Sequence, residues 1–379
     1  DMARVAVTSD GKVHVVWEEG LNIAYRSLST AGVWSGVTTL FYGGSQPAIA
    51  SNGSAVAVAF VRDASRQNPD DRTEVFVRTF NPGTGQWSEL APPIDLSEDG
   101  TQPDVAFSPR DGTLWVAWSD YTYDSGRPYL AHLRAGGVVS AGNCGNFEAA
   151  IAPSVAVDAE GNVYVARTDM LEEGEEPQVA YARLPHGGAT CTNDEGPPAY
   201  KARMANLAIT PKDFCLAWEQ DFGPGNQDVV LGCKVDGGWL APNMSNSSGV
   251  PSLAPRLALD EVMGSLLVWQ EADRQDTVMF RHNPPPPAAG QPVTNGAADS
   301  GSPDLDYADG FVHSVWTEWV SATDSDVHYA RWPVVVPTPT PTATASPTAT
   351  ATGTATPDAT ASPTPGAGHR IYLPFTSMR

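Results

Sequence analysis

A unit of similar sequence recurs along this chain, and the repetition constrains the fold more than any other feature. Most copies have a short alternating stretch, a turn carrying Asp-Gly, Asn-Gly or Glu-Gly, and a Val-rich stretch that ends in an aromatic residue, as in "ARVAVTSDGKVHVVWEE" and "QPDVAFSPRDGTLWVAWSD". The spacing between the ends of successive Val-rich stretches runs from 43 to 58 residues. Seven such ends mark seven copies: Trp17, Phe60, Trp118, Arg167, Trp218, Trp269 and Trp316.

Each copy reads as four antiparallel strands. The turns supply the positive φ angles that tight hairpins need, and the alternation on either side marks strands. A third stretch ends near a basic residue, as in "IAYR" and "VAYAR", and most copies add a Gly-rich or Trp-containing fourth stretch. Four strands at this period are typical of a β-propeller blade, and helical periodicity is absent. The sequence therefore predicts an all-β fold, a seven-bladed β-propeller over residues 1–334.

A tail of different composition follows the repeats. Residues 335–368 are rich in Pro, Thr and Ala and predict an extended linker, which at about 3.1 Å per residue reaches on the order of 100 Å. Residues 369–379 contain "RIYLPF", in which Ile371, Tyr372, Leu373 and Phe375 have the character of a short terminal β-strand. Thr interleaved with Pro is also the composition of O-glycosylated stalks.

Sugar acceptors are predicted in both parts of the chain. The linker threonines are the better candidates for O-linked sugar, and three Asn-x-Ser sequences fit the N-linked pattern. These candidates are Thr338, Thr340, Thr342, Thr344, Asn52, Asn243 and Asn246.

The charge and the first residue favour an exported protein. The formal net charge of −22 predicts repulsion from nucleic acid and from anionic membrane surfaces. No apolar run is long enough to span a membrane. The chain begins with Asp1 and carries no leader, so we interpret it as a mature form from which a signal has been removed. We expect an extracellular or cell-surface location.

The four cysteines predict two disulfides. Cys215 and Cys233 are centred on the turn-like Gly223-Pro224-Gly225, so two strands meeting there would bring them face to face. Cys144 and Cys191 then remain as the second pair, although sequence alone does not fix connectivity. The alternative is four buried free thiols. Metal binding by the cysteines is disfavoured because no CxxC or HxxxH spacing occurs.

Charged residues recur at fixed places in the repeats. Arginines close most third strands, and a residue used in nearly every blade indicates a structural role. Carboxylates recur just past the second-strand ends and should lie around one face, where they could bind Ca²⁺ or a cationic sugar or serve as general acid and base. We favour a solvated acidic loop face instead, and expect no metal, no other cofactor and no catalytic residue that the sequence identifies. The five carboxylates are Glu19, Asp120, Asp169, Glu271 and Glu318.

The repeats resemble the sialidase-like, Asp-box group of secreted propellers, above all in "SPRDGTLWVAW". That family's box is Ser-x-Asp-x-Gly-x-Thr-Trp between outer strands, whereas Ser108 and Asp111-Gly112 are one residue out of register and fall in the predicted inner hairpin. The resemblance implies arginines for a substrate carboxylate, a Tyr–Glu nucleophile pair and an acidic proton donor. The chain has no "RIP" near its first strand and no matching constellation. The Pro/Thr tail ending in "RIYLPF" is similar to the tails of certain secreted bacterial surface proteins.

Two function classes follow from the strand count. The seventh copy has only three strands before the linker, so its last strand has an open edge, and residues 369–379 form a strand without a blade. In the first class, the tail strand adds to a neighbouring propeller and forms a homo-oligomer or filament of a non-catalytic, secreted structural protein. The alternative is a propeller that binds glycans, or cleaves them as a sialidase-like glycoside hydrolase, and is anchored at the cell surface. The first class is our prediction.

Overall fold

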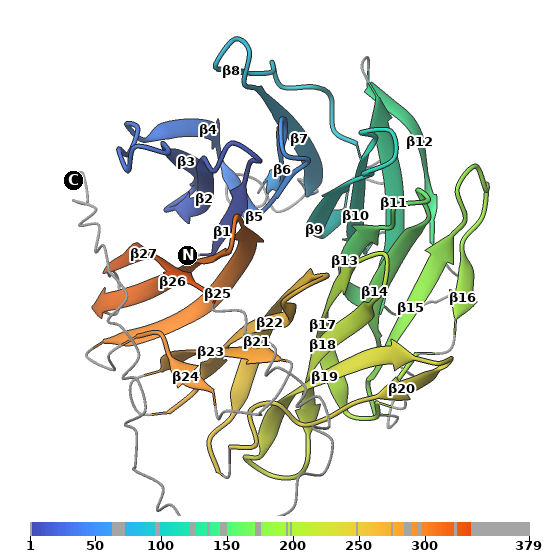
Figure 1. Ribbon diagram of the computed structural model, residues 1–379. Coiled ribbons are helices and arrows are strands. Elements are labelled where there is room, and N and C mark those ends of the chain that lie inside the picture. The colour runs from blue at the N-terminus through green and yellow to red at the C-terminus, as the bar shows by residue number, and fades with distance from the viewer. Residues whose placement is uncertain are drawn as a thin grey trace, which may run out of the picture.

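The computed structural model describes residues 2–62, 73–94, 99–121, 126–134, 137–144, 150–170, 176–194, 196–197, 199–247, 249–273, 276–283, 290–294, 298–321 and 324–334. These ranges contain strands and no helix, and the strands form seven separate antiparallel sheets. Figure 1 shows the sheets arranged around a common axis as the blades of a propeller. The predicted all-β, seven-bladed fold is confirmed. The linker and the terminal strand, including Thr338 and Ile371, lie outside the described residues, as does Asp1.

In each blade the strands follow one another in chain order from the axis outwards. The first three blades comprise β1 (Ala3–Val7), β2 (Val13–Glu19), β3 (Asn22–Leu28) and β4 (Thr38–Tyr42); β5 (Gly44–Ser51), β6 (Val56–Arg62), β7 (Glu74–Asn81) and β8 (Gln86–Trp87); and β9 (Gly100–Phe107), β10 (Leu114–Asp120), β11 (Arg127–Arg134) and β12 (Gly137–Asn143).

Blades 4 to 7 repeat this plan, and blade 7 has three strands in the described part of the chain. They comprise β13 (Ala150–Val157), β14 (Val163–Asp169), β15 (Gln178–Leu184) and β16 (Thr192–Asp194); β17 (Ala202–Ile209), β18 (Phe214–Asp221), β19 (Gln227–Val235) and β20 (Gly238–Leu240); β21 (Ser252–Asp260), β22 (Gly264–Glu271), β23 (Thr277–Asn283) and β24 (Gln291–Pro292); and β25 (Asp299–Ala308), β26 (Phe311–Ser321) and β27 (Asp324–Pro333).

The hairpin turns between first and second strands form as the sequence predicts. Between β9 and β10 the N–H of Gly112 donates to Ser108 O at 2.9 Å, and the N–H of Thr113 donates to Asp111 Oδ1 at 3.1 Å. Gly112 has a φ of +71°, a conformation that glycine adopts without steric cost. The sequence that resembles an Asp box is therefore an inner hairpin turn.

The hydrophobic core lies between blades. Each main cluster combines apolar residues of two neighbouring sheets, such as Val75 of blade 2 with Val116 of blade 3. Both faces of each sheet are buried in this way, which explains why the second strands are nearly continuous apolar runs. Trp118 is fully buried against blade 2. Arg167 occupies the equivalent place in blade 4 and is also fully buried, with its Nε 2.7 Å from Asp169 Oδ1.

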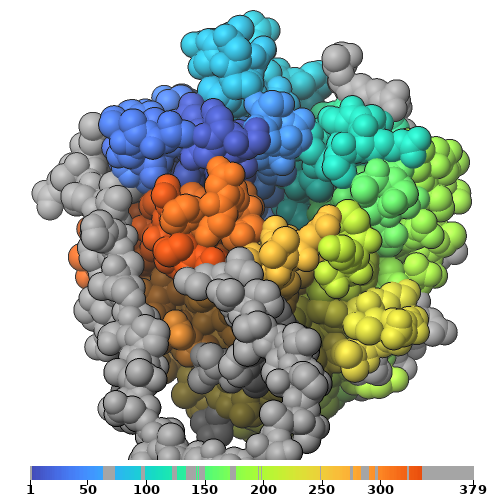
Figure 2. All heavy atoms as spheres, in the orientation of Figure 1, coloured from blue at the N-terminus to red at the C-terminus, as the bar shows by residue number. Residues whose placement is uncertain are grey.

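Non-covalent contacts join blade 7 to blade 1. Figure 2 shows these first and last blades packed side by side. The N–H of Val5 donates to Asp304 Oδ2 at 2.9 Å, and the N–H of Val7 donates to Asp306 Oδ2 at 2.7 Å. The Trp34 ring packs edge-on against Tyr329, with ring centroids 5.5 Å apart. In the described part of the chain no strand of blade 1 pairs with blade 7, so these contacts close the ring.

The structure contains both expected disulfides. Cys215 of β18 lies opposite Cys233 of β19 in the strand register, with the two Cα atoms 4.1 Å apart. Cys144 and Cys191 join blade 3 to blade 4, with their Cα atoms 5.1 Å apart. Disulfides form and persist in oxidising compartments, so they are compatible with an extracellular protein. The described residues include no helix that could cross a membrane.

Candidate functional site

A backbone irregularity recurs in the innermost strands. Six of them contain a non-glycine residue with a φ between 51° and 56°, and the register with the second strand shifts around it. Positive φ is costly for such residues and persists only where the surroundings fix it. The six residues are Gln46, Gln102, Ala152, Met204, Ala254 and Ser302.

At each of these six bulges the backbone N–H donates a hydrogen bond to a side chain of the preceding blade. The N–H of Ala152, for example, donates to Gln102 Oε1 at 2.9 Å, and the N–H of Ala254 donates to Glu219 Oε1 at 2.8 Å. Because the acceptor belongs to the neighbouring sheet, the bond fixes the bulge and joins two blades at once. The other acceptors are Glu18, Gln46, Thr168 and Gln270.

One side chain from every blade reaches the propeller axis, and in the six blades with a bulge it lies two residues after the bulge. In five blades this residue follows a proline, as in Gln102-Pro103-Asp104. The seven residues at this position are Arg4, Ala48, Asp104, Ser154, Asn206, Arg256 and Asp304. They line a cavity of about 430 Å³ together with neighbouring residues of the inner strands.

Several of these polar side chains also connect the blades. The N–H of Val155 donates to Asp104 Oδ2 at 2.8 Å, and the N–H of Leu257 donates to Asn206 Oδ1 at 2.7 Å. Nε of Arg256 lies 3.5 Å from Asp304 Oδ1. The ring therefore has a structural role, and it fixes the positions of the groups that face the cavity.

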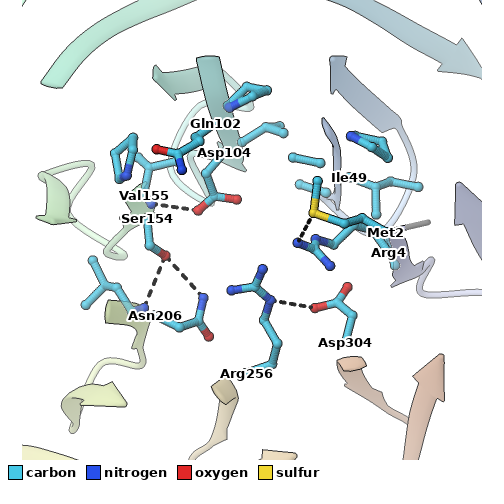
Figure 3. A pocket seen from close by; sticks show the side chains of 18 of the residues that line it. Met2, Arg4, Ile49, Gln102, Asp104, Ser154, Val155, Asn206, Arg256 and Asp304 are labelled. Carbon is cyan, nitrogen blue, oxygen red and sulfur yellow. Dashed lines mark hydrogen bonds and ion pairs between the residues drawn. The ribbon is translucent and has the colours of Figure 1, made fainter. Parts of the chain in front are cut away.

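Arg4 differs from the other charged members of the ring. Its guanidinium donates to Ala3 O at 3.0 Å and to the Met2 sulfur at 3.8 Å, and no carboxylate of the described residues forms an ion pair with it. Figure 3 shows the Arg4 and Arg256 guanidinium groups turned into the cavity. Burial and the nearby Arg256 charge lower the pKa of Arg4 to about 10. The charges of Asp304, Asp104 and Glu18 oppose this shift, so carboxylates stabilise the Arg4 charge from nearby without a direct ion pair to it.

Burial also affects the cavity carboxyl groups. It raises the pKa of Asp104 and of Asp304, against the opposing effects of backbone donors and of the arginines. It raises the pKa of Asp306, which lines the same cavity, to about 6. Burial therefore disfavours the charged form of Arg4 and of the three carboxyl groups alike. This is the expected effect of desolvation on ionisable side chains that line one cavity.

The prediction of a solvated acidic loop face is wrong for three of its five residues. Glu19 is exposed and Glu318 is half-buried, 3.7 Å from His328. Asp120, Asp169 and Glu271 are buried at the ends of their second strands.

Two of these buried carboxylates have local partners that explain their burial. Asp169 pairs with Arg167. Glu271 accepts a bond from the Trp269 indole at 2.6 Å and one from the Ser252 hydroxyl at 3.1 Å. Asp169 and Glu271 thus bond to side chains of their own strand or of the neighbouring strand in the same blade, and they form no ring of ligands. Within the described ranges no group of three or more His, Cys, Asp or Glu is placed to hold a metal ion.

The third-strand arginines have the structural contacts that their repetition indicated. Arg26 Nε donates to Ser35 O at 2.6 Å, and Arg78 Nη1 reaches Leu40 O of the preceding blade at 2.7 Å. None of these arginines lines the cavity.

The N-linked candidates occupy different environments. Asn52 and Asn246 are exposed, whereas the Asn243 amide donates to the buried Asp228 carboxylate at 2.7 Å. The O-linked candidates Thr338, Thr340, Thr342 and Thr344 lie outside the described residues.

Sequence reasoning missed the cavity residues although a signal was present. Five repeats contain x-Pro-x near their start, and the residue after the proline changes from Ala to Asp, Ser, Arg and Asp while its neighbours stay small or apolar. When one position differs from repeat to repeat while the rest of the inner-strand pattern stays the same, its side chains face a surface to which every blade contributes.

Comparison with known proteins supports the fold. No family model matches the sequence, and no curated protein matches it. Among solved structures, a mutant of Trypanosoma rangeli sialidase displaying trans-sialidase activity shares 11% identity with a TM-score of 0.53, over 85% of this chain and 59% of that chain.

Two further structures cover most of their own length. The GH93 α-L-arabinofuranosidase of Fusarium graminearum shares 12% identity with a TM-score of 0.55, over 77% of this chain and 93% of that chain. The β-propeller domain of the Trilobed protease from Pyrococcus furiosus, reported with an open velcro topology, shares 8% identity with a TM-score of 0.52. This match covers 86% of this chain and 98% of that chain. Identities this low show a shared fold alone.

Proposed function

We propose that this protein is an extracellular glycan-binding propeller and that the central cavity binds an acidic sugar. The observation that carries the proposal is Arg4, a guanidinium that faces the cavity beside Arg256 and forms no direct ion pair with a carboxylate of the described residues. A carboxylate or sulfate group on a ligand would supply a direct anionic acceptor for Arg4 and a second one for Arg256, which already pairs with Asp304.

The remaining lining suits the rest of a sugar. Gln102, Ser154 and Asn206 contribute amide and hydroxyl groups that can exchange hydrogen bonds with sugar hydroxyls. A cavity of about 430 Å³ is within the usual range for small-molecule sites. Two of the structural neighbours are a sialidase and an arabinofuranosidase, so glycan recognition is a known use of this fold.

Exposed aromatic residues provide a second support. Tyr42 ends β4 immediately before β5 begins, Tyr200 lies just before β17, and Phe222 follows β18, so all three lie at the face where the inner strands begin. They are 77%, 63% and 54% exposed. Exposed aromatic side chains commonly mark contact surfaces, and their flat faces suit the apolar faces of pyranose rings.

The test is a glycan-array screen of the full chain, followed by calorimetry with the best acidic and the best neutral oligosaccharide. Arg4→Gln removes the unpaired charge and should weaken acidic-glycan binding by about 10- to 100-fold, the range for charge-assisted hydrogen bonds. Arg110→Gln is the matched control, because Arg110 is an exposed arginine in the β9–β10 turn. Equal binding by Arg4→Gln and the unmodified chain would contradict the proposal.

Glycoside cleavage is the second candidate, favoured by the raised pKa of Asp104 in the same cavity. Burial raises the pKa of the Asp104 carboxyl group, and a general acid requires a shift in this direction. The sialidase variant of this chemistry lacks support, because neither tyrosine nor glutamate is among the described residues that line the cavity. Release of reducing sugar from a bound oligosaccharide, abolished in Asp104→Asn, would establish cleavage.

A further inference from the structure

The outer edge of blade 7 differs from the outer edges of the other blades. β27 pairs with β26 along one side over ten residues, from Asp324 to Pro333. Its other side has no partner in the part of the chain that the structure describes, whereas a fourth strand covers this edge in the other six blades. The main-chain groups of an open edge are a template for another strand.

We propose that this edge binds residues 370–376 of a second copy of the chain as a fourth strand. The segment reads "RIYLPFT" and places Ile371 and Leu373 on one side and Tyr372 on the other. Pro374 lacks an N–H donor, which an edge strand tolerates. Strand addition of this kind obtains affinity from main-chain hydrogen bonds and specificity from alternate side chains.

The Pro-rich linker is long and extended enough to carry the segment to a second copy. In the other blades the connection from third to fourth strand ranges from two residues, between β11 and β12, to nine residues, between β3 and β4. Here 36 residues, 334–369, separate β27 from the segment. At about 3.1 Å per residue they extend over roughly 110 Å, about twice the roughly 50 Å diameter expected for a 334-residue domain.

Charge favours the same contact. The chain has 22 Lys and Arg and 44 Asp and Glu; residues 335–379 hold two Arg and one Asp, so residues 1–334 carry 20 − 43 = −23. The only charged residues of segment 369–379 apart from His369 are Arg370 and Arg379. β27 carries Asp324 and Asp326 at its start and Arg331 near its end. A basic strand is thus attracted to an acidic propeller, and at this edge to the start of β27, where Asp324 and Asp326 lie.

Assembly in this way is head-to-tail. Each copy offers one edge and one strand, and a heterologous contact of this kind forms a filament unless it closes into a ring. The proposal is independent of the cavity and of any glycan that it binds.

The first test is sedimentation velocity of the full chain over a wide range of concentration. The unmodified chain should form larger species as concentration rises. Ile371→Asp with Leu373→Asp should weaken association by about a hundredfold or more, because two large apolar side chains no longer become buried. Thr352→Asp with Thr354→Asp adds the same charge within the linker and should associate like the unmodified chain. Identical distributions for all three chains, or a monomer at every concentration, would overturn the proposal.

The second test separates pairing between chains from pairing within one chain. The Ile371→Asp, Leu373→Asp chain keeps its edge, and an Asp324→Lys, Asp326→Lys chain keeps its strand. Each should be largely monomeric alone, and a mixture should form a heterodimer. A mixture that stays monomeric shows that the segment folds onto its own blade or pairs with nothing.

Discussion

Replacing Asp304 tests how the propeller ring is closed. In Asp304→Ala the buried N–H of Val5 loses its acceptor, which costs about 1–3 kcal/mol. The partly exposed ion pair with Arg256 contributes at most about 1 kcal/mol more. Burial disfavours the charged form of Asp304, as its raised pKa indicates, so removing this carboxylate also relieves a desolvation penalty and offsets part of the loss. We therefore expect a net loss of about 2–3 kcal/mol in the free energy of unfolding.

This loss converts into a measurable shift in the melting temperature. An unfolding entropy of about 2.1 cal/mol/K per residue gives roughly 0.7 kcal/mol/K for a 334-residue domain, so Asp304→Ala should melt about 3–4 °C lower. Asp304→Asn keeps an oxygen acceptor for Val5 and should melt within about 1 °C of the unmodified chain. Differential scanning calorimetry at one fixed scan rate measures all variants.

Asp104→Ala is the matched control, because Asp104 holds in blade 3 the place that Asp304 holds in blade 7. Asp104 accepts the Val155 N–H at 2.8 Å, but the chain itself connects blades 3 and 4, whereas blades 7 and 1 are joined by side-chain and main-chain contacts alone. Asp304→Ala should therefore lower the melting temperature more than Asp104→Ala does. Equal shifts, or an unchanged melting temperature for Asp304→Ala, would refute the view that this junction limits stability.

Three further predictions follow from single sites. Because burial raises the folded-state pKa of Asp306 to about 6, its contribution to stability is present below about pH 4 and is lost as the pH rises through about 6. Asp306→Asn should remove up to about 3 kcal/mol of that pH dependence, measured by urea titration at each pH. Replacing Cys215 and Cys233 by Ala opens a loop with a sequence separation of 18 and should cost about 3 kcal/mol, whereas peptide mapping under non-reducing conditions that finds both thiols free would remove the premise. If a host attaches N-linked sugar, occupancy by peptide mass spectrometry should be high at Asn246 and low at Asn243, whose amide is donated to Asp228; the reverse order would contradict this assignment.

The repeat pattern was sufficient to predict the architecture. The spacing of Trp17, Trp118 and Trp218 reflects the burial of one large side chain between each pair of blades, a requirement that every repeat must satisfy separately. The Cys215–Cys233 pair could also be predicted, because a hairpin fixes the register of two strands from the position of its turn.

The site could not be predicted in the same way. Arg4, Asp104 and Arg256 are distant in the sequence, and only closure of the ring brings their side chains to one axis. Asp120, Asp169 and Glu271 are buried, and Asp169 and Glu271 bond to partners in their own or the neighbouring strand. An interpretation of each loop from its composition alone therefore placed these carboxylates in solvent. Local pattern determines a strand and its hairpin, because those contacts are near in sequence; the polarity and charge of the central cavity are decided by seven strands that meet only in the folded propeller.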